Sequence, residues 1–391
     1  MKWTPGSLAF LSLVIILAGS IAAFARGQDT LSPQTETIVP EFQYINETAT
    51  NLSGGNKTGT TNINFFSGAI GINLEKLAGL KSTKFYTRVI YKTGGMPNEF
   101  FGTLQGISNL EAVDIFALQD CWFEKEIGDK AAVLFGIHDL NTDFDVKSSS
   151  ALFTQPSHAI GSEFAGGGIN GPSIFPFSSL ALRLRYDLNE NLRLKIAVFD
   201  GVPNSNHKFT EVKLSVEEGA LLVLEMAART ADTGFAGIGG WYFSGKSFTV
   251  NAGDPPAENE FRAGSSGAYC YYDNPEVFEF NLIKLGMYAR FGLANSLFSK
   301  VHYYFGCGAI LQNVIVQGDI AGVCYAIGRL NPEFSGTRSL PRYESAIEFS
   351  YNRDTFSWLE VQPTIVYVMN PAGTKNSNKA FGGSIRFIAE F

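Results

Sequence analysis

The chain has 391 residues, of which 45% are hydrophobic and only 17% charged, and its formal net charge is −7. The 33 Phe and 15 Tyr exclude a mainly disordered protein. The 4 Cys are too few for a disulfide scaffold. The acidic balance, without a cluster of Lys and Arg, argues against nucleic acid as a partner.

Residues 1–25 have the features of a cleavable signal peptide. Lys2 precedes an apolar run from Leu8 to Ala25, which ends in the small-x-small triplet Ala23-Phe24-Ala25. A single membrane anchor is the alternative, because the run is close to spanning length. The next residues, 26–61, are polar and rich in Ser, Thr, Asn and Gly, and we interpret them as a flexible or periplasmic leader.

From Asn62 onward, apolar and polar residues alternate with a period of two. Residues 180–188 alternate throughout, 189–191 are suited to a turn, and 192–198 alternate again, which predicts a β-hairpin. Comparable segments are Phe85–Tyr91, Val113–Phe123, Lys130–Ile137, Gly219–Arg229, Ile283–Leu293, Val301–Phe305, Ala321–Arg329, Tyr343–Tyr351, Leu359–Met369 and Ser384–Phe391. Most are near the length of a transmembrane strand, roughly nine to eleven residues. The sequence therefore predicts an all-β protein, a closed antiparallel transmembrane β-barrel of about sixteen strands over residues 62–391.

The C-terminus favours a membrane barrel over a soluble β-sandwich, which would show the same alternation. Residues 385–391 alternate up to a terminal aromatic residue, Phe391. The end of a soluble chain usually frays into water. In an outer-membrane barrel, the last strand closes against the first, and an aromatic end lies in the interfacial girdle. We therefore expect outer-membrane lipid and the barrel-assembly machinery as partners, with Phe391 as an assembly residue.

A series of short motifs, in order along the chain, is similar to the carbohydrate-selective porins of the OprB family. The motifs lie at 102–112, 139–146, 170–176, 182–186, 197–203, 218–222, 239–246, 360–363 and 370–371, followed by the closing strand. The resemblance runs from about Asn51 to Phe391. It implies a Gram-negative outer-membrane location and passive diffusion of small sugars, without a cofactor. Preference for sugars is implied by the resemblance alone.

A porin acts through a water-filled lumen whose lining matches the solute. A charge facing lipid at the bilayer midplane costs about 2–4 kcal/mol, so the charged positions of alternating strands are expected to face inward. The inward-facing candidates for the solute path are Arg88, Arg183, Arg185, Arg193, Lys195, Glu225, Arg290, Glu344, Glu348, Glu360 and Gln362. The alternative is that these groups pair with one another only to fill and stiffen the barrel.

Connecting segments carry further expectations. Residues 144–179 are rich in Gly, Ser and Pro and are predicted to include a constriction loop inside the barrel. Residues 251–267 and 331–341 resemble surface loops. Cys307 and Cys324 are placed on neighbouring strands and are the better disulfide candidates, although isolated thiols fit equally well.

No catalytic or metal-binding set is recognisable in the sequence. The His residues at 138, 158, 207 and 302 lack metal-ligand spacing, and no compact Ser/His or Asp/His set is present. We therefore expect a porin rather than an enzyme, with sugars as solutes and a homo-oligomer left open. A general or anion-preferring porin is the first alternative, because of the basic cluster at 183–195. A barrel enzyme or adhesin is the alternative from another class.

Overall fold

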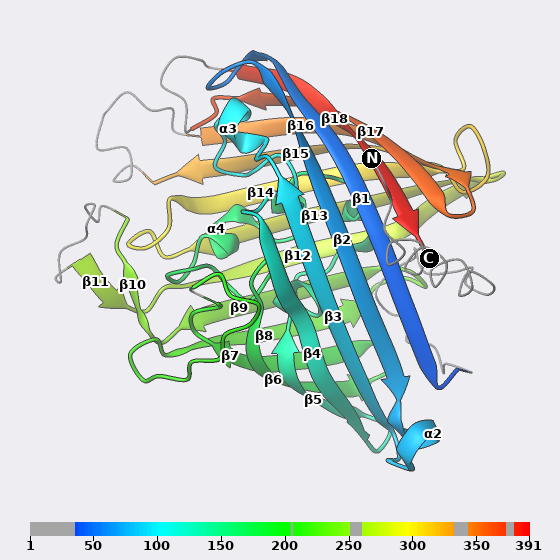
Figure 1. Ribbon diagram of the computed structural model, residues 1–391, viewed down its shortest axis with the longest axis vertical. Coiled ribbons are helices and arrows are strands. Elements are labelled where there is room, and N and C mark those ends of the chain that lie inside the picture. The colour runs from blue at the N-terminus through cyan, green and yellow to red at the C-terminus, as the bar shows by residue number, and fades with distance from the viewer. Residues whose placement is uncertain (1–35, 205, 251–259, 332–342, 373–378) are drawn as a thin grey trace, which may run out of the picture.

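The computed structural model describes residues 36–204, 206–250, 260–331, 343–372 and 379–391. Sixteen of the described strands form one closed antiparallel barrel, in which β1 pairs with both β2 and β18 (Figure 1). The barrel strands are β1 (Ile38–Gly54), β2 (Gly59–Asn73), β3 (Thr83–Gly94), β4 (Ile115–Ile127), β5 (Ala131–His138), β6 (Ser179–Asn189), β7 (Leu192–Asp200), β8 (Ala220–Arg229), β9 (Phe235–Phe243), β12 (Ser266–Phe280), β13 (Ile283–Ala294), β14 (Val301–Gln312), β15 (Ile320–Leu330), β16 (Tyr343–Phe356), β17 (Leu359–Met369) and β18 (Lys379–Glu390). The predicted fold class is confirmed.

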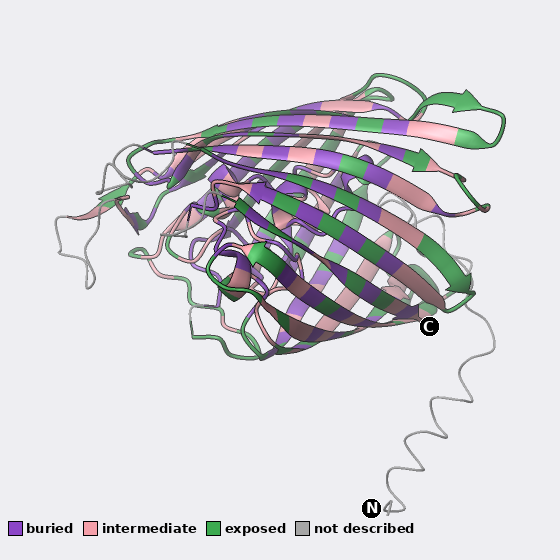
Figure 2. Cartoon of the chain, turned by 90° about the horizontal axis from the view of Figure 1, so that it is seen from above, coloured by how far each residue is buried: buried purple, intermediate pink, exposed green. Residues whose placement is uncertain are grey.

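The alternating sequence builds these strands by sending successive side chains to opposite faces. In β6, Leu182 is 53% exposed on the outer face, whereas its neighbour Arg183 is 4% exposed inside the barrel. The predicted hairpin is present, because β6 pairs with β7 in a register that sets Leu182 opposite Val198. Figure 2 shows the resulting stripes of buried and exposed residues along the strands.

The barrel closes where the C-terminal residue meets the first strand. The Phe391 N–H donates to the Phe42 carbonyl (2.9 Å), and the Phe42 N–H donates to the Phe391 carbonyl (3.1 Å). The Phe391 ring stacks on Trp358, with 6.2 Å between ring centroids. The terminal aromatic residue is therefore part of the seam.

The interpretation of residues 26–61 as a polar leader is wrong from residue 38 onward. β1 and the first residues of β2 lie in that range and are full barrel strands, so the barrel begins at Ile38 rather than Asn62. The sequence concealed them because their outward positions carry polar Asn46, Thr48 and Asn62 instead of apolar residues. The expected signal peptide, 1–25, lies outside the described residues.

Connections differ in length at the two ends of the barrel. At the end where β1 begins and β18 ends, here called the terminus end, the turns are short, and one contains the helix α2 (Leu74–Ala78). At the opposite loop end, the long segments 95–114, 139–178 and 201–219 connect strands, and β10 (Lys246–Phe248) pairs with β11 (Phe261–Ala263) outside the barrel wall. None of the helices in the described part of the chain is long and apolar enough to span a membrane.

Other expectations on the connections have mixed outcomes. Of the predicted surface loops, 251–259 and 332–341 lie outside the described residues. Both cysteines of the disulfide candidate are free thiols. Cys307 is opposite Tyr325 and Gly308 is opposite Cys324, so the two thiols project from opposite faces of the sheet. This one-position offset in register prevents the bond.

Candidate functional site

The segment 139–178 folds back into the barrel instead of extending from its rim. It contains the short helices η1 (Leu140–Thr142), η2 (Ser148–Ser150), η3 (Pro156–His158) and α4 (Ser162–Ala165). Phe164 is fully buried, and its ring stacks on Trp241 of β9 with centroids 4.2 Å apart. Phe144 is also fully buried, in a cluster with Phe199 and Val223 of the wall. The predicted constriction segment, 144–179, coincides with most of this insertion.

Carboxylates of the inner wall hold the backbone of the inserted segment. Glu225 of β8 accepts the Asp145 N–H at 2.7 Å. Asp273 of β12 accepts the N–H groups of residues 148 and 149 at 2.7 and 3.1 Å. Glu348 of β16 accepts those of residues 154 and 155 at 2.7 and 2.9 Å. Each contact is a charge-assisted hydrogen bond from a main-chain donor of the inserted segment.

Two more wall carboxylates hold the segment 95–114, which contains the helix α3 (Asn98–Phe101). Glu344 accepts the Gln105 N–H at 2.9 Å and the Ala372 N–H at 2.7 Å, and so ties this segment to the connection after β17. Glu47 of β1 accepts the Ser108 hydroxyl at 2.7 Å. Its other partner is Arg386 of β18, with Nε 2.9 Å from the carboxylate, across the closing seam.

Arg290 of β13 supplies the cation that balances the buried end of the insertion. Its guanidinium lies 2.7 Å from Asp145 and 2.8 Å from Glu163, both in the inserted segment. All three side chains are at most 1% exposed. A second cation, Lys147, contacts Asp145 at 2.6 Å. The acidic wall residues and Arg290 therefore form a frame that fixes the insertion.

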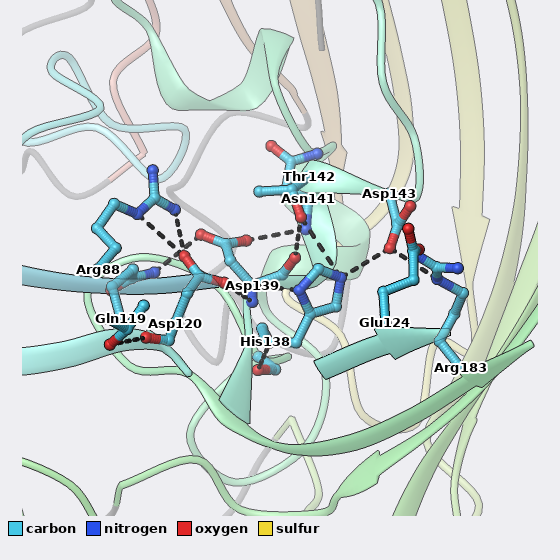
Figure 3. A network of polar contacts seen from close by, with 12 residues as sticks. Arg88, Gln119, Asp120, Glu124, His138, Asp139, Asn141, Thr142, Asp143 and Arg183 are labelled. Carbon is cyan, nitrogen blue, oxygen red and sulfur yellow. Dashed lines mark hydrogen bonds and ion pairs between the residues drawn. The ribbon is translucent and has the colours of Figure 1, made fainter. Parts of the chain in front are cut away.

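A second polar network joins the insertion to β4, β5 and β6 (Figure 3). Asp143 accepts from Arg183 Nε at 3.0 Å and lies 2.7 Å from His138 Nε2. His138 Nδ1 is 3.5 Å from Asp120, and Asp120 binds Arg88 at 2.6 Å. Burial acts to raise the pKa of Asp143, but the attraction of Arg183 and the contact with His138 outweigh it, so the pKa lies well below its usual range. Asp143 is therefore ionised between cationic neighbours.

Two cavities open on opposite sides of the insertion. The cavity at the terminus end has a volume of about 600 Å³, and the cavity at the loop end about 770 Å³. The insertion contributes Thr142, Asp143 and Ser148 to the first cavity, and Pro156, Ser157 and Ile160 to the second, among others. We call the cavity at the terminus end the inner vestibule.

The predicted lumen residues separate into two groups. Five of the predicted residues are cations that line the inner vestibule: Arg88, Arg183, Arg185, Arg193 and Lys195. Lys84, Arg229 and eight carboxylate side chains line it as well. A second group contacts the inserted segments: Glu225, Arg290, Glu344, Glu348 and Gln362, the last through the Leu152 carbonyl at 2.5 Å. Glu360 instead accepts from Asn352 at 2.8 Å.

The vestibule cations differ in how completely they are paired. Arg183 binds Glu124 at 2.7 Å, Arg193 binds Asp187 at 2.7 Å, and Lys195 binds Glu225 at 3.0 Å. Arg185 has no ion pair with any residue that the structure describes, and its Nε is buried without a hydrogen-bond partner. Arg185 is therefore the vestibule cation with the most unused hydrogen-bonding capacity.

Sequence reasoning missed Asp120 because of a β-bulge. Arg88 pairs with Asp120, but Val89 pairs with Leu118, so Gln119 is an extra residue in β4. Gln119 and Asp120 are consecutive, yet both are buried. A bulge re-aims a side chain locally and breaks the period of two. The loop residues Asp143 and Asp145 were missed because alternation gives no information about connections.

His158 provides a pH-dependent prediction for the insertion. Burial and then the nearby Lys147 lower the pKa of His158 to about 3, and the Tyr288 hydroxyl lies 2.7 Å from its Nδ1. Because the unfolded pKa is higher, about 6.5, the stabilising contribution is complete above pH 6.5 and is lost as pH falls toward 3. At pH 5, the loss should be on the order of 2 kcal/mol. Proteolysis within 139–178 of the folded barrel should accelerate from pH 7.5 to pH 5.

A His158→Gln variant is the matched control, because the Gln side chain does not titrate. Its cleavage rate, divided by protease activity at each pH, should be flat over the same range. An equal acceleration in the variant would show that another group controls the release of the segment.

Residues 57–391 match the family described as "Carbohydrate-selective porin, OprB family", which covers well over half of the chain. The chain belongs to the OprB family of carbohydrate-selective porins. The resemblance noted in the sequence is thereby confirmed. As an OprB-family porin, the protein is an outer-membrane, carbohydrate-selective channel.

Two relatives extend the comparison of this OprB-family porin. It is 22% identical to Porin B of Pseudomonas aeruginosa over 404 residues, covering 90% of this chain and 87% of the relative. It is similar to a high-pH structure of Pseudomonas putida OprB, with a TM-score of 0.78 and 18% identity over 91% of this chain and 94% of that one. A Salmonella typhi OmpF structure with daunomycin gives a TM-score of 0.58 and 9% identity, over 90% and 97%. The two structural matches support the barrel fold.

Proposed function

We propose that small sugars diffuse passively through the lumen and bind weakly to basic side chains in the mixed, charged lining of the inner vestibule. The observation that carries this proposal is the gathering of Arg88, Arg183, Arg185, Arg193 and Lys195 around one cavity directly beneath the insertion. Guanidinium groups donate several hydrogen bonds in fixed directions, which suits the hydroxyl oxygens of a sugar. The insertion narrows the path between the two cavities.

Arg185 is the residue we assign the largest share of sugar binding. Its guanidinium forms no ion pair with the described residues. A sugar hydroxyl can therefore bind the guanidinium without displacing a carboxylate from it. The paired cations Arg183 and Arg193 hold the neighbouring carboxylates in place. The role of the set is therefore cooperative: paired cations shape the vestibule, and Arg185 contacts the solute.

Single-channel conductance in a planar bilayer tests the proposal. Glucose should block stepwise channels of the purified chain in a saturable way, whereas a non-sugar solute of similar size should not. Arg185→Met should raise the half-blocking glucose concentration about tenfold, as expected when one hydrogen bond from a charged group is lost. Arg353→Met, which removes an exposed cation of β16 outside the vestibule lining, is the matched control and should leave the block unchanged.

An anion-preferring pore is the second candidate function, and the same five cations favour it. Reversal potentials in a salt gradient distinguish the two candidates. Strong anion preference without glucose block would replace the sugar proposal. The proposal assigns no catalytic residue. If the folded barrels formed no channels in the bilayer, an enzyme or an adhesin would become the favoured function.

We also propose that Phe391 is read by the barrel-assembly machinery during insertion into outer-membrane lipid. Support comes from its place at the seam, where its backbone exchanges two hydrogen bonds with Phe42. Removing Phe391 should lower the yield of folded barrel in cells but not after refolding in detergent. An equal loss in both settings would show that Phe391 acts only through the stability of the seam.

A further inference from the structure

The connection 201–219, between β7 and β8 at the loop end, exposes a series of large apolar side chains. These are Phe209, Val212, Leu214 and Val216. Leu214 is 71% exposed and Val216 is 99% exposed. Polar residues alternate with the apolar ones from residue 211 to residue 217. A contiguous apolar group on a protein surface usually marks a site of interaction with a partner or a membrane.

The connection is fixed to the barrel on both sides of this apolar series. Before it, the ring of His207 stacks on Phe177, which follows the insertion, with centroids 4.8 Å apart. Within it, the Lys213 N–H donates to the carboxylate of Asp200, the last residue of β7, at 3.3 Å. The apolar side chains are therefore held at the rim of the barrel.

One residue of the series, Phe209, lies on the outer surface of β4. The Leu118 N–H of β4 donates to the Phe209 carbonyl at 2.7 Å. The rings of Phe209 and Phe116 have centroids 5.1 Å apart. Phe116 is exposed, whereas its neighbours Ile115 and Ala117 are buried inside the barrel, so Phe116 projects outward. The connection therefore reaches the outside of the wall at this point.

The outer surface at Phe116 belongs to a continuous row of aromatic residues. Phe116 is the register partner of Tyr91 in β3, and Tyr91 is the partner of Phe66 in β2. All three are exposed, and the rings of Phe66 and Tyr91 stack with centroids 6.1 Å apart. Aromatic residues on the outer face of a membrane barrel form the girdle at the lipid–water interface. Phe209 extends this row beyond the strands and onto the connection.

We propose that residues 209–216 lie in the membrane interface at the loop end, with their apolar side chains in contact with lipid acyl chains. The surface is continuous with the aromatic girdle through Phe209, and lipid is the partner that already covers that girdle. Alternation of apolar and polar residues is the amphipathic pattern expected of a segment lying along an interface.

The charged neighbours of the apolar series are compatible with this position. Lys208 forms an ion pair with Glu211 at 3.3 Å, and Lys213 forms one with Glu218. Paired charges can remain in the hydrated headgroup layer while the adjacent apolar side chains enter the acyl layer. The surface lies outside the barrel, so the proposal does not depend on which solute passes through the lumen.

Spin labelling in lipid nanodiscs tests the proposal directly. Leu214→Cys is introduced into a chain whose four natural cysteines are replaced by Ala, and the labelled barrel is placed in phosphatidylcholine nanodiscs. The label should collide more often with oxygen, which concentrates in hydrocarbon, than with a water-soluble nickel chelate. Leu224→Cys, at an exposed outward position of β8, is the lipid reference. Lys246→Cys, at an exposed position of β10, is the water reference.

The ratio of the two collision rates decides the outcome. At position 214, this ratio should be nearer to that of the lipid reference than to that of the water reference. A ratio equal to that of the water reference would overturn the proposal. Few collisions with either reagent would show that protein, for example a second copy of the chain, covers the position, and this result would overturn the proposal as well.

Cleavage by trypsin after Lys213 provides a second measurement that needs no label. In nanodiscs, lipid contact should protect this site. Leu214→Ser with Val216→Ser should be cut about tenfold faster, because the protease acts on molecules in which the segment has left the membrane. The matched control, Val314→Ser with Ile315→Ser, changes exposed apolar residues between β14 and β15 and should be cut at the wild-type rate. Equal rates in the first variant and the wild type would contradict the proposed membrane contact.

Discussion

Replacing Arg290 with Met should release the inserted segment 139–178 from the barrel wall. The substitution removes the cation between Asp145 and Glu163, so Asp145 keeps only Lys147 as a buried cationic partner and Glu163 loses its ion pair with Arg290. Removing one partner of a buried ion pair is destabilising by about 3–5 kcal/mol. The barrel itself is held by backbone pairing between strands, so the substitution should destabilise the position of the insertion rather than the barrel. Single-channel conductance should rise, current noise should increase, and protease should cleave within 139–178.

Arg193→Met is the matched control for this result. Arg193 also faces the lumen and binds the carboxylate of Asp187, but its side chain is 37% exposed. A solvent-exposed ion pair contributes only about 0–1 kcal/mol, so the insertion should stay in place. Equal conductance in the Arg290 variant and the wild type would show that Arg290 does not hold the segment.

Replacing Gly382 with Ala should prevent most molecules of the protein from closing into a barrel. A Cβ atom at this position of β18 would lie 2.1 Å from the Thr50 carbonyl oxygen and 3.0 Å from the Asn51 Cα. Both obstructing atoms belong to the backbone of β1, so the closing strands would have to move apart. Overpacking of this kind costs on the order of 3 kcal/mol. Here the overpacking would weaken the pairing of β18 with β1 at the seam. The yield of folded barrel, measured by the heat-dependent shift in gel migration, should collapse.

Gly71→Ala tests whether any added methyl group has the same effect. Gly71 also lies in a barrel strand, β2, but the nearest atoms to its added Cβ would be 3.8 Å away in the Tyr86 ring. This variant should fold with nearly the wild-type yield. A similar collapse would mean that loss of glycine flexibility, rather than contact across the seam, is responsible.

The alternating pattern predicted most of the barrel because its physical cause is local. Each strand places apolar side chains toward lipid and polar ones inward, as Leu184 and Arg185 do in β6. Where that cause is absent, the prediction was wrong. β1 has Asn46 and Thr48 at outward positions, so the strand was interpreted as a leader. The bulge at Gln119 similarly concealed Asp120, because one extra residue reverses the parity of those that follow it.

The sequence predicted which charged residues line the lumen, but it did not predict which groups they bind. Parity placed Glu225 and Glu348 inside, yet nothing in the strands revealed that backbone N–H groups of the insertion would meet them. Such pairings join residues far apart in sequence, between a strand and an irregular connection. Knowledge of the folded path was needed to separate the vestibule cations from the residues that hold the insertion.

The wall carboxylates bind main-chain N–H groups, which every residue except proline possesses. Side chains at positions 148, 149, 154 and 155 can therefore be exchanged without removing the wall's contacts with their N–H groups. Of these four side chains, that of Thr154 adds a hydroxyl hydrogen bond to Glu348 at 3.2 Å, so the main-chain contacts are the part of the attachment that does not depend on side-chain identity. A channel built this way can acquire a new lining, by natural variation or by engineering, while the insertion keeps its position in the barrel.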